Sequence, residues 1–411
     1  MSEGTLQMDQ TIDNVEHDAV TRKLESQAVR NFKVPETTIK NLKVMLGIGA
    51  LAAFVGLVFQ RENLWASLLV NAYYLIGLGL GAIFFICINY VAASGWSVVT
   101  RRVSEAMTGI IPIGALGIGI VLLAGYDIYP AFGEEEHLTG FKALWLRYDF
   151  VLVRAVVYIA IWFYFTRAIL TNSRQQDHDG NRSHTQKNAR LSALFIVLFS
   201  LAAWLSSFDW IMSLEPHWFS TIFGVYCFSG FFSSSIAVTI ILLVWLQKQG
   251  ALNGIVTDEH LHDLGKLLFA FTTFWAYIWF SQYMLIWYSD MPEETNYFIV
   301  RTGTVWGPLF IFNILLNWLV PFFVLMPART KRNMGILVKV AIVVLVGHWL
   351  DLYLMVYPAI SPDTIKFGLV EIGLPIGALG LYGLVTLKKL SEHPLVPIKD
   401  PYLQESLHHH Q

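Results

Sequence analysis

The sequence predicts an all-α polytopic membrane protein with about ten transmembrane helices. Of its 411 residues, 55% are hydrophobic and 14% are charged, and the mean hydropathy is +0.52. A soluble domain carries roughly 25% charged residues. The apolar residues form long runs, and about 20 such residues cross the hydrocarbon core as a helix. Because these runs do not alternate with a period of two, helices are favoured over a β-barrel.

Ten apolar stretches define a membrane domain at 44–387, between a polar N-terminal tail at 1–43 and a C-terminal tail at 388–411. In chain order they are 44–59, 64–93, 110–124, 150–165, 191–212, 219–246, 264–288, 305–326, 336–356 and 367–387. The third and the tenth contain glycines at helical spacing, among them Gly373, Gly377 and Gly380 in the tenth. Such glycines let two membrane helices approach closely.

The basic residues predict the orientation. Most of the 28 Lys and Arg residues fall in the two tails and in the loops on the same side of the membrane. Because Lys and Arg concentrate in cytoplasmic segments, both termini are predicted to be cytoplasmic. The polar loop 171–190 lacks apolar periodicity and is predicted to be flexible. The end of the chain, His408 to His410, is predicted to be disordered, because three histidines without neighbouring ligands make a poor metal site.

The stretch 206–230, SSFDWIMSLEPHWFSTIFGVYCFSG, joins two apolar spans and carries three ionisable residues close together, Asp209, Glu215 and His217. Pro216 fits this turn because proline is tolerated where a new helix begins. Ionisable groups at the rim of a membrane domain are uncommon and often functional. They can equally be solvated loop residues, so the sequence leaves both interpretations open.

Arg154 and Asp209 are charged residues inside adjacent predicted spans. Each costs roughly 2.5–3.5 kcal/mol at the bilayer centre, so each needs a partner or water. Both are predicted near the outer ends of antiparallel helices, where a forked guanidinium can meet a carboxylate. The pair is either a structural ion pair or a proton-handling pair beside a polar cavity.

His348 and Asp351 are three residues apart in the ninth span and therefore share a helix face. An aspartate raises the proton affinity of a neighbouring imidazole. Histidine titrates near physiological pH and can accept a proton from a quinol hydroxyl. The alternative is a satisfied histidine in the helical core.

A weak internal repeat links the two aspartates. Asp209 is followed seven residues later by Pro216, and Asp351 is followed seven residues later by Pro358. Four spans separate the two pairs, which is the pattern of two related four-helix units. With only two residues matched, chance is the competing explanation.

Composition and motifs exclude several functions. The two cysteines, Cys87 and Cys227, both fall inside apolar spans, and no CxxCH motif is present. No metal, iron–sulfur or c-type haem site is therefore predicted in this chain, and deep histidines are too few for bis-histidine haem. The net charge is −2 and the basic residues are dispersed among loops, which argues against nucleic-acid binding.

The motif SSFDWIMSLEPHWFSTIFGVYCFSGFF, followed by a serine-rich helix, resembles the second large membrane subunit of bacterial alternative complex III. This complex is a quinol:electron-acceptor oxidoreductase, and its membrane subunits are related to NrfD-like, polysulfide-reductase-type subunits. The resemblance implies two four-helix bundles, at about 64–212 and 219–356, flanked by one helix on each side. It places the protein in the bacterial cytoplasmic membrane.

The resemblance also implies the partners. They are a paralogous ten-helix subunit, a periplasmic iron–sulfur subunit, c-type cytochromes, lipid and, in some complexes, a terminal oxidase. Haem c and iron–sulfur clusters are then expected in those partners, and quinone or menaquinone is the only cofactor this chain itself could bind.

Three functions follow. In the first, the chain is a respiratory membrane subunit that contributes to quinone binding, to a proton pathway or to both. Asp209, His217, His348 and Asp351 would then transfer protons or line a quinone site, with Arg154 and Glu215 shaping the cavity. In the second, it is a structural anchor of the same complex. In the third, favoured only by the repeat, it is a secondary transporter.

Overall fold

The computed structural model describes residues 32–132 and 138–409. Over these residues the chain forms helices and no β-sheet, and every predicted apolar stretch is helical over most of its length. In the described part of the chain, nine segments are long and apolar enough to span a membrane. A further helix, α10 (Asp258–Ser289), is equally long but rich in Trp and Tyr, which lowers its mean hydropathy. The predicted fold class, an all-α polytopic membrane protein of about ten helices, is confirmed.

The long helices besides α10 are α2 (Glu36–Phe59), α3 (Arg61–Val91), α7 (Tyr148–Asp179), α8 (Ser183–Trp210), α9 (Phe223–Lys248), α15 (Met334–Ile360) and α16 (Leu369–Glu392). One span, Ser183–Leu214, extends α8 by the short helix η5 (Met212–Leu214), and two others are built entirely from short helices. One is Val98–Ala124, made of η1 (Val98–Thr100), α4 (Arg101–Met107), η2 (Thr108–Ile110) and α5 (Ile111–Ala124). The other is Gly307–Leu325, made of α12 (Gly307–Ile314), the π-helical turn η6 (Leu315–Leu319) and α13 (Val320–Leu325).

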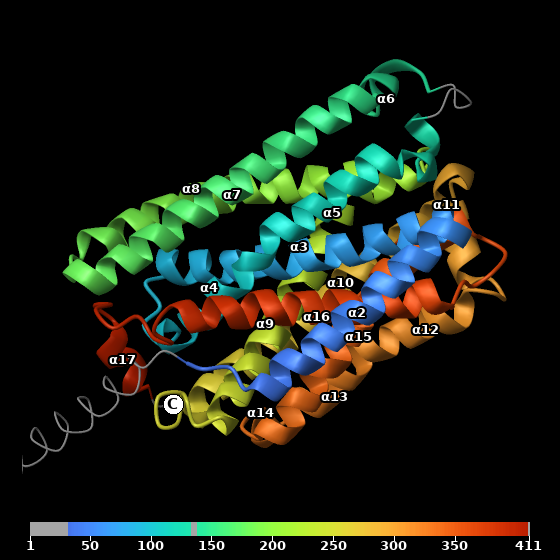
Figure 1. Cartoon of the computed structure of the whole chain (residues 1–411). Coiled ribbons are helices and arrows are strands. Elements are labelled where there is room, and N and C mark those ends of the chain that lie inside the picture. Colours follow the sequence, from blue (N-terminus) through green and yellow to red (C-terminus); the bar gives the residue numbers. More distant parts are fainter. Residues whose placement is uncertain (1–31, 133–137, 410–411) are drawn as a thin grey trace, which may run out of the picture.

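Short helices cover the two ends of the bundle. They are η3 (Tyr126–Ile128), η4 (Pro130–Phe132), α6 (Gly140–Trp145), η5 (Met212–Leu214), α11 (Pro292–Thr302), α14 (Ala328–Lys331) and α17 (Leu403–Leu407). Figure 1 shows α6 and α11 at one end, which we call the far face, and α14 and α17 at the other, which we call the terminal face. The sequence predicts that the terminal face is cytoplasmic.

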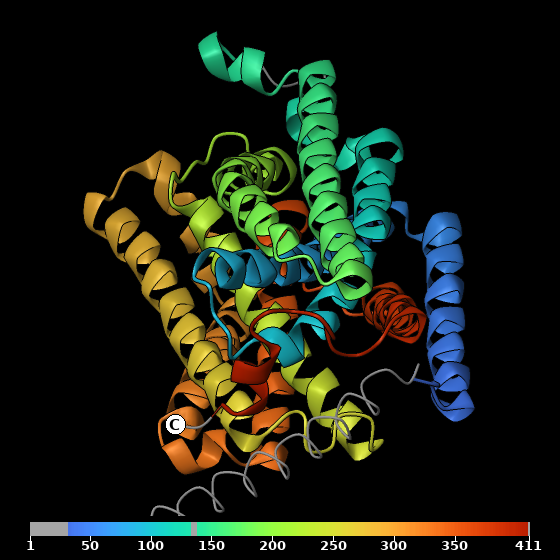
Figure 2. The ribbon, with the colours of Figure 1, turned by 90° about the vertical axis from the view of Figure 1, so that its left-hand side faces the viewer.

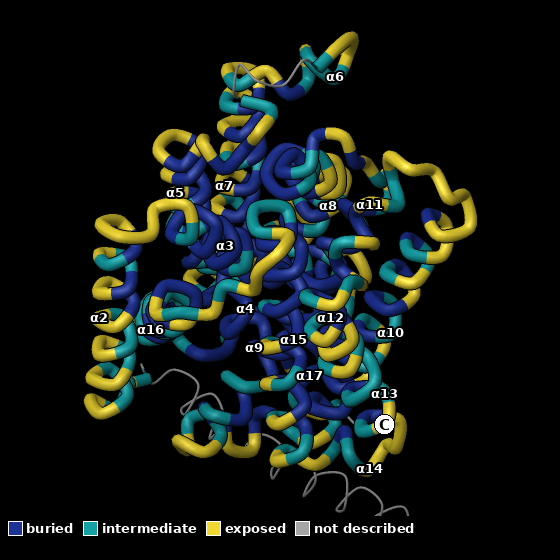
Figure 3. Tube along the Cα trace, turned by 90° about the vertical axis from the view of Figure 1, so that its right-hand side faces the viewer, coloured by how far each residue is buried: buried dark blue, intermediate teal, exposed yellow. Residues whose placement is uncertain are grey.

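Helices α3 and α9 form the centre of the bundle. They pack against each other, α3 also contacts α5, α8, α15 and α16, and α9 also contacts α8, α10 and α15. Figure 3 shows this interior as mostly buried, whereas α2 is largely exposed. The helices around α3 (α5, α7 and α8) and those around α9 (α10, α12–α13 and α15) therefore form two groups that meet at the α3–α9 contact.

Helix α2 is held at the edge of the bundle mainly by α16. The glycines noted in the tenth span make this contact: a Cβ atom on Gly49 would lie only 2.4 Å from the Cα atom of Gly377. The two backbones thus touch, as glycine at helix interfaces permits. Helix α2 begins at Glu36, within the predicted N-terminal tail 1–43, and residues 1–31 of that tail lie outside the described residues.

The prediction of a flexible loop at 171–190 is wrong. Helix α7 continues to Asp179, α8 begins at Ser183, and only a short turn with Gly180 at a φ of +68° joins them. Glycine adopts this left-handed conformation without steric cost. Polar pairs hold the two helices together, since Asn172 Nδ2 donates to Asn188 Oδ1 over 3.0 Å.

The prediction of a disordered end is wrong for His408 and His409; His410 lies outside the described residues. The part of the chain after α16, residues 393–409, is called the C-terminal segment, and Figure 2 shows it lying across the terminal face. His409 Nε2 lies 2.7 Å from Asp263 Oδ2, and the hydroxyl of Ser406 donates to the carbonyl of Trp96 over 2.7 Å. The buried Leu395, Val396 and Leu403 explain the attachment, because burial of apolar side chains favours a fixed segment.

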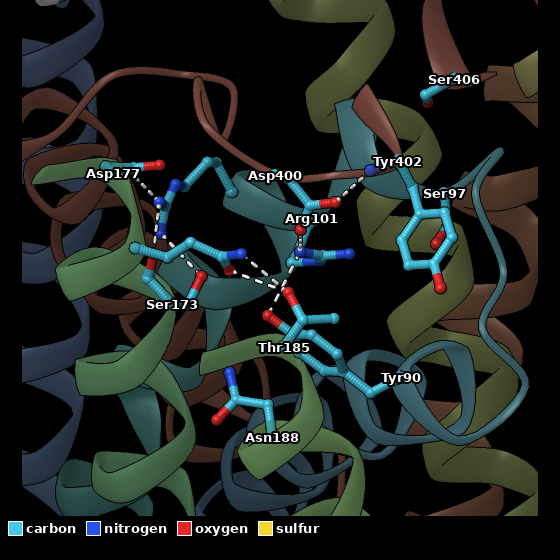
Figure 4. A network of polar contacts seen from close by, with 12 residues as sticks. Tyr90, Ser97, Arg101, Ser173, Asp177, Thr185, Asn188, Asp400, Tyr402 and Ser406 are labelled. Atoms are coloured by element: carbon cyan, nitrogen blue, oxygen red, sulfur yellow. Dashed lines mark hydrogen bonds and ion pairs between the residues drawn. The ribbon is translucent and has the colours of Figure 1, made fainter. Parts of the chain in front are cut away.

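The C-terminal segment also completes a buried polar network (Figure 4). Arg101 forms an ion pair with Asp400, and both side chains are buried. Next to it, Arg102 pairs with Glu105 and Asp177, and Asp177 accepts from the backbone N–H of Ile398 over 3.1 Å. The charged side chains at the terminal face are therefore neutralised partly by residues that lie almost 300 positions later in the chain.

We predict that Asp400→Asn destabilises the protein. The substitution leaves the buried Arg101 without its counter-charge, and breaking a buried ion pair costs about 3–5 kcal/mol. Thermal unfolding of the detergent-purified protein measures the loss. As a matched control, Asp149→Asn removes a carboxylate whose ion pair with Arg147 is solvent-exposed, and it should leave the unfolding temperature nearly unchanged. Equal unfolding temperatures for all three proteins would contradict the structural role of the segment.

Candidate functional site

Two aspartates are buried in the far-face half of the bundle, Asp209 on α8 and Asp351 on α15. Each carboxylate accepts one hydrogen bond from a tryptophan indole and one from a tyrosine hydroxyl. The donors are Trp145 and Tyr158 for Asp209, and Trp275 and Tyr226 for Asp351. The two carboxylates that the weak repeat singled out thus have similar neutral donors, although these come from different helices.

Asp209 is neutralised by Arg154, as the sequence predicted. Arg154 Nε lies 2.8 Å from Asp209 Oδ2, and Arg154 Nη2 lies 2.7 Å from Asp209 Oδ1. The guanidinium also lies over the ring of Trp145, with 4.0 Å to the ring centroid. With Trp145 and Tyr158, four hydrogen bonds hold this carboxylate beside a permanent positive charge. This geometry favours the structural ion pair over the proton-handling alternative.

Asp351 lacks a permanent cation among its hydrogen-bond partners. Its third donor is the neutral amide of Asn313, 2.8 Å away, which is itself bonded to Asn317. Asn317 belongs to the π-helical turn η6, a distortion that often accompanies functional sites. Among the described residues, the basic side chain within ion-pairing distance of Asp351 is His348, whose Nδ1 lies 3.7 Å from Asp351 Oδ2.

The His348 imidazole is buried and, among the described residues, neither ring nitrogen has a hydrogen-bond partner. An unpaired carboxylate in a low-dielectric interior costs several kcal/mol. The hydrogen-bond donors of Asp351 carry no permanent positive charge, and its basic neighbour is an imidazole rather than a guanidinium. In this respect the pair differs from Arg154 and Asp209, where a guanidinium holds the carboxylate.

Close packing fixes the position of the His348 ring. The ring lies between Tyr74 of α3 and Phe231 of α9, with centroid distances of 5.5 and 5.9 Å. Gly230 provides the space on α9, because a Cβ atom there would lie 2.1 Å from His348 Cε1. The contact between the two central helices therefore holds the imidazole in place.

A small cavity lies next to Asp351 on the far-face side. Its volume is about 20 Å³, and its polar lining comes from Tyr226, Gln282, Tyr297, Arg301, Asn313 and Asp351. This volume is enough for about one water molecule. It is far below the roughly 300–1,000 Å³ of a pocket for a ring-sized organic ligand, so a quinone head group does not fit there.

Arg301, which lines the cavity, binds Glu215 on the far-face side. Arg301 Nη2 lies 2.7 Å from Glu215 Oε1, and Arg301 also donates to the carbonyls of Leu354 and Met355 at the end of α15. The side chain of Glu215 is 22% exposed. His348, Asp351, the cavity, Arg301 and Glu215 therefore form a polar series from the helix interior to the far face.

Two outcomes differ from the sequence-based expectations. Arg301 falls between the predicted apolar stretches 264–288 and 305–326, although in the structure it is almost fully buried in the short helix α11; its apolar neighbours in the sequence were the one signal of this burial. His217 was grouped with the proton-transfer candidates, but it is exposed after η5 and is not a hydrogen-bond partner of Asp209 or Asp351. Within residues 32–132 and 138–409, no three His, Cys, Asp or Glu side chains gather as a metal site requires.

We predict that Asp209→Asn destabilises the protein by about 3 kcal/mol, because Arg154 stays buried without a counter-charge. Thermal unfolding in detergent measures this loss. The double variant Arg154→Gln/Asp209→Asn should recover much of it, since no unpaired charge remains. Additive losses in the double variant would show that the two side chains are not coupled as an ion pair.

We predict that Gly230→Ala costs about 1–3 kcal/mol, because the new methyl group overlaps the His348 ring and must displace it. Gly119→Ala is the matched control. A Cβ atom at Gly119, also inside a membrane helix, meets no atom within 4 Å, so this change should be neutral or slightly stabilising. Similar unfolding temperatures for both variants would contradict the tight packing of His348.

Comparison of the chain with models of known protein families finds no match, and comparison with curated protein sequences finds no significant match either.

Proposed function

We propose that this chain is a membrane subunit of a respiratory quinol:electron-acceptor oxidoreductase of the alternative complex III type. In this proposal it lies in the bacterial cytoplasmic membrane with both termini in the cytoplasm. The chain carries no redox centre; it conducts protons, while its partners carry the iron–sulfur clusters and c-type haems. Asp351 and His348 are the proton-exchanging pair, and Glu215 is the exit to the far face.

The observation that carries the proton role is the buried pair His348 and Asp351 beside a water-sized cavity. A proton held by this pair has a polar neighbour on its far-face side, the cavity lined by Arg301 and Asn313. One water there would connect Asp351 to the Arg301–Glu215 pair by hydrogen bonds. The far face is the predicted periplasmic side, where a quinol-oxidising complex releases protons.

The membership in the complex rests on the sequence resemblance of 206–232. The ten-helix arrangement is compatible with it, as are the two helix groups that meet at α3 and α9. Within this proposal the Arg154–Asp209 pair stabilises the fold and does not carry protons. Quinone binding by this chain finds no support in the cavity next to Asp351, because that cavity holds about one water.

The structural-anchor alternative is favoured by one specific observation, the saturated Arg154–Asp209 pair. If Asp351 served only the same purpose, its permanent counter-charge would be expected beside it, as Arg154 is beside Asp209. The carboxylate has a titratable histidine there instead. This difference separates the two functions experimentally.

We predict that Asp351→Asn lowers quinol oxidation per assembled complex by about tenfold or more, since a positioned proton-transfer group contributes about 10²–10⁴-fold. The complex is purified through a tag on this chain, and turnover is normalised to the c-type haem that co-purifies. His348→Gln should show a similar loss.

Asp400→Asn is the matched control, because it also removes a buried carboxylate but at the terminal face, outside the polar series. It should change stability and leave turnover per haem unchanged. Full turnover of Asp351→Asn would refute the proton role and favour the anchor. A preparation without co-purifying haem would refute the membership in a respiratory complex.

A further inference from the structure

A groove of about 290 Å³ lies on the terminal-face half of the bundle, between the α4–α5 segment, α7 and α16. It is separate from the polar series around Asp351. Its lining contains apolar and basic side chains together: Ile111, Pro112, Phe163 and Leu170 on the one hand, and Arg167, Arg174 and Lys389 on the other. The remaining lining residues include the threonines of α4–α5 and α7.

Helix α7 supplies half of the lining from one face. The α7 residues that line the groove recur at positions i, i+3, i+4, i+7, i+8 and i+11, which is the spacing of one helix face. They are Phe163, Thr166, Arg167, Leu170, Thr171 and Arg174. Phe163, which is 46% exposed, lies deepest in the membrane, and Arg174 lies nearest the terminal face. The groove is therefore apolar towards the membrane centre and basic towards the predicted cytoplasmic surface.

The two arginines of this groove have no carboxylate partner. Across the described residues, neither Arg167 nor Arg174 has an Asp or Glu oxygen within ion-pairing distance. The one acid in the lining, Glu105, is already engaged by Arg102 and by the hydroxyl of Ser173, 2.6 Å away. Lys389 forms an ion pair with Glu392, with 2.8 Å between Nζ and Oε2.

Two buried hydrogen-bond donors at the groove, one of them on Arg174, lack acceptors among the described residues. In the described structure, Arg174 Nε and Thr166 Oγ1 are buried and have no hydrogen-bond partner, and Thr166 as a whole is only 8% exposed. Leaving a buried donor unsatisfied costs about 1–3 kcal/mol, and more for a charged group. An oxygen-rich anion in the groove would satisfy both donors and both guanidinium charges.

We propose that this groove binds an anionic phospholipid, with its phosphate oxygens at Arg167, Arg174 and Thr166 and an acyl chain along Phe163 and Ile111. Guanidinium groups recognise phosphate by paired hydrogen bonds. Basic grooves between membrane helices on the cytoplasmic side are suited to lipid head groups. A free phosphate ion would leave the apolar wall uncovered, whereas a phospholipid covers both parts of the groove.

The test is native mass spectrometry of the delipidated, detergent-purified chain with dioleoyl phosphatidylglycerol. The wild type is expected to retain the lipid, and Arg167→Gln/Arg174→Gln is expected to bind it about tenfold more weakly, from the loss of two phosphate-directed charges. Arg182→Gln/Arg190→Gln is the matched control: it removes two exposed arginines of the same face outside the groove and should bind like the wild type.

Arg167→Lys/Arg174→Lys keeps both charges and should retain most of the binding, which separates loss of charge from misfolding; unfolding temperatures of all variants are compared. Dioleoyl phosphatidylcholine, which has a phosphate but no net charge, should bind more weakly than phosphatidylglycerol. Equal retention by the wild type and Arg167→Gln/Arg174→Gln would overturn the proposal. Displacement of phosphatidylglycerol by an equal concentration of inorganic phosphate would also overturn it, because the groove would then be a site for the free ion.

Discussion

A buried carboxylate in a membrane domain needs partners that offset its lost hydration, and the function we propose depends on the partners of Asp351. Hydrogen bonds from Tyr226, Trp275 and Asn313 stabilise the carboxylate but do not balance its charge. Among the described residues, His348 is the basic side chain within ion-pairing distance of this carboxylate, with Nδ1 3.7 Å from Asp351 Oδ2. Asp209 differs from Asp351 in this respect, because the permanent positive charge of Arg154 balances its charge. Similar donors thus surround one arginine–aspartate pair and one histidine–aspartate pair.

The packing of the central helices follows from these buried groups. Helix α9 contributes Gly230 against the His348 ring and Tyr226 to Asp351, so a shift of α9 relative to α15 would disturb both. At the far face, Arg301 ties α11 to the end of α15 and to Glu215. At the terminal face, the C-terminal segment closes the bundle by pairing Asp400 with Arg101. Both ends are therefore fixed by buried ions, while the interior between them depends on close apolar packing.

The sequence predicted the contacts that depend on local geometry. His348 and Asp351 are three residues apart on one helix and therefore share a face. Arg154 and Asp209 lie on consecutive antiparallel helices, a connection that places their far-face ends side by side. The glycines of α16 similarly indicated a close helix contact, which the structure places at Gly49 and Gly377. The ten apolar stretches were sufficient to predict the fold class.

The remaining contacts depend on tertiary structure that a single sequence does not reveal. Arg301 and Glu215 are 86 residues apart, and Arg101 and Asp400 are 299 apart, so no local pattern links either pair. The stretch 171–190 is polar and was predicted to be flexible; in the fold its asparagines pair across two helices that extend beyond the apolar spans. Arg167 and Arg174 lack a carboxylate partner because Glu105, the acid in the groove, already binds Arg102 and Ser173, and these contacts follow from the tertiary structure.

In the function we propose, Asp351 and His348 exchange a proton whereas Asp209 does not. Infrared difference spectroscopy of the purified chain, between acidic and neutral pH, tests it directly because a protonated carboxyl group has its own carbonyl band. We predict a pH-dependent carboxyl or imidazole signal that is lost in Asp351→Asn and His348→Gln and is retained in Asp209→Asn. A signal unchanged in Asp351→Asn but lost in Asp209→Asn would contradict the account.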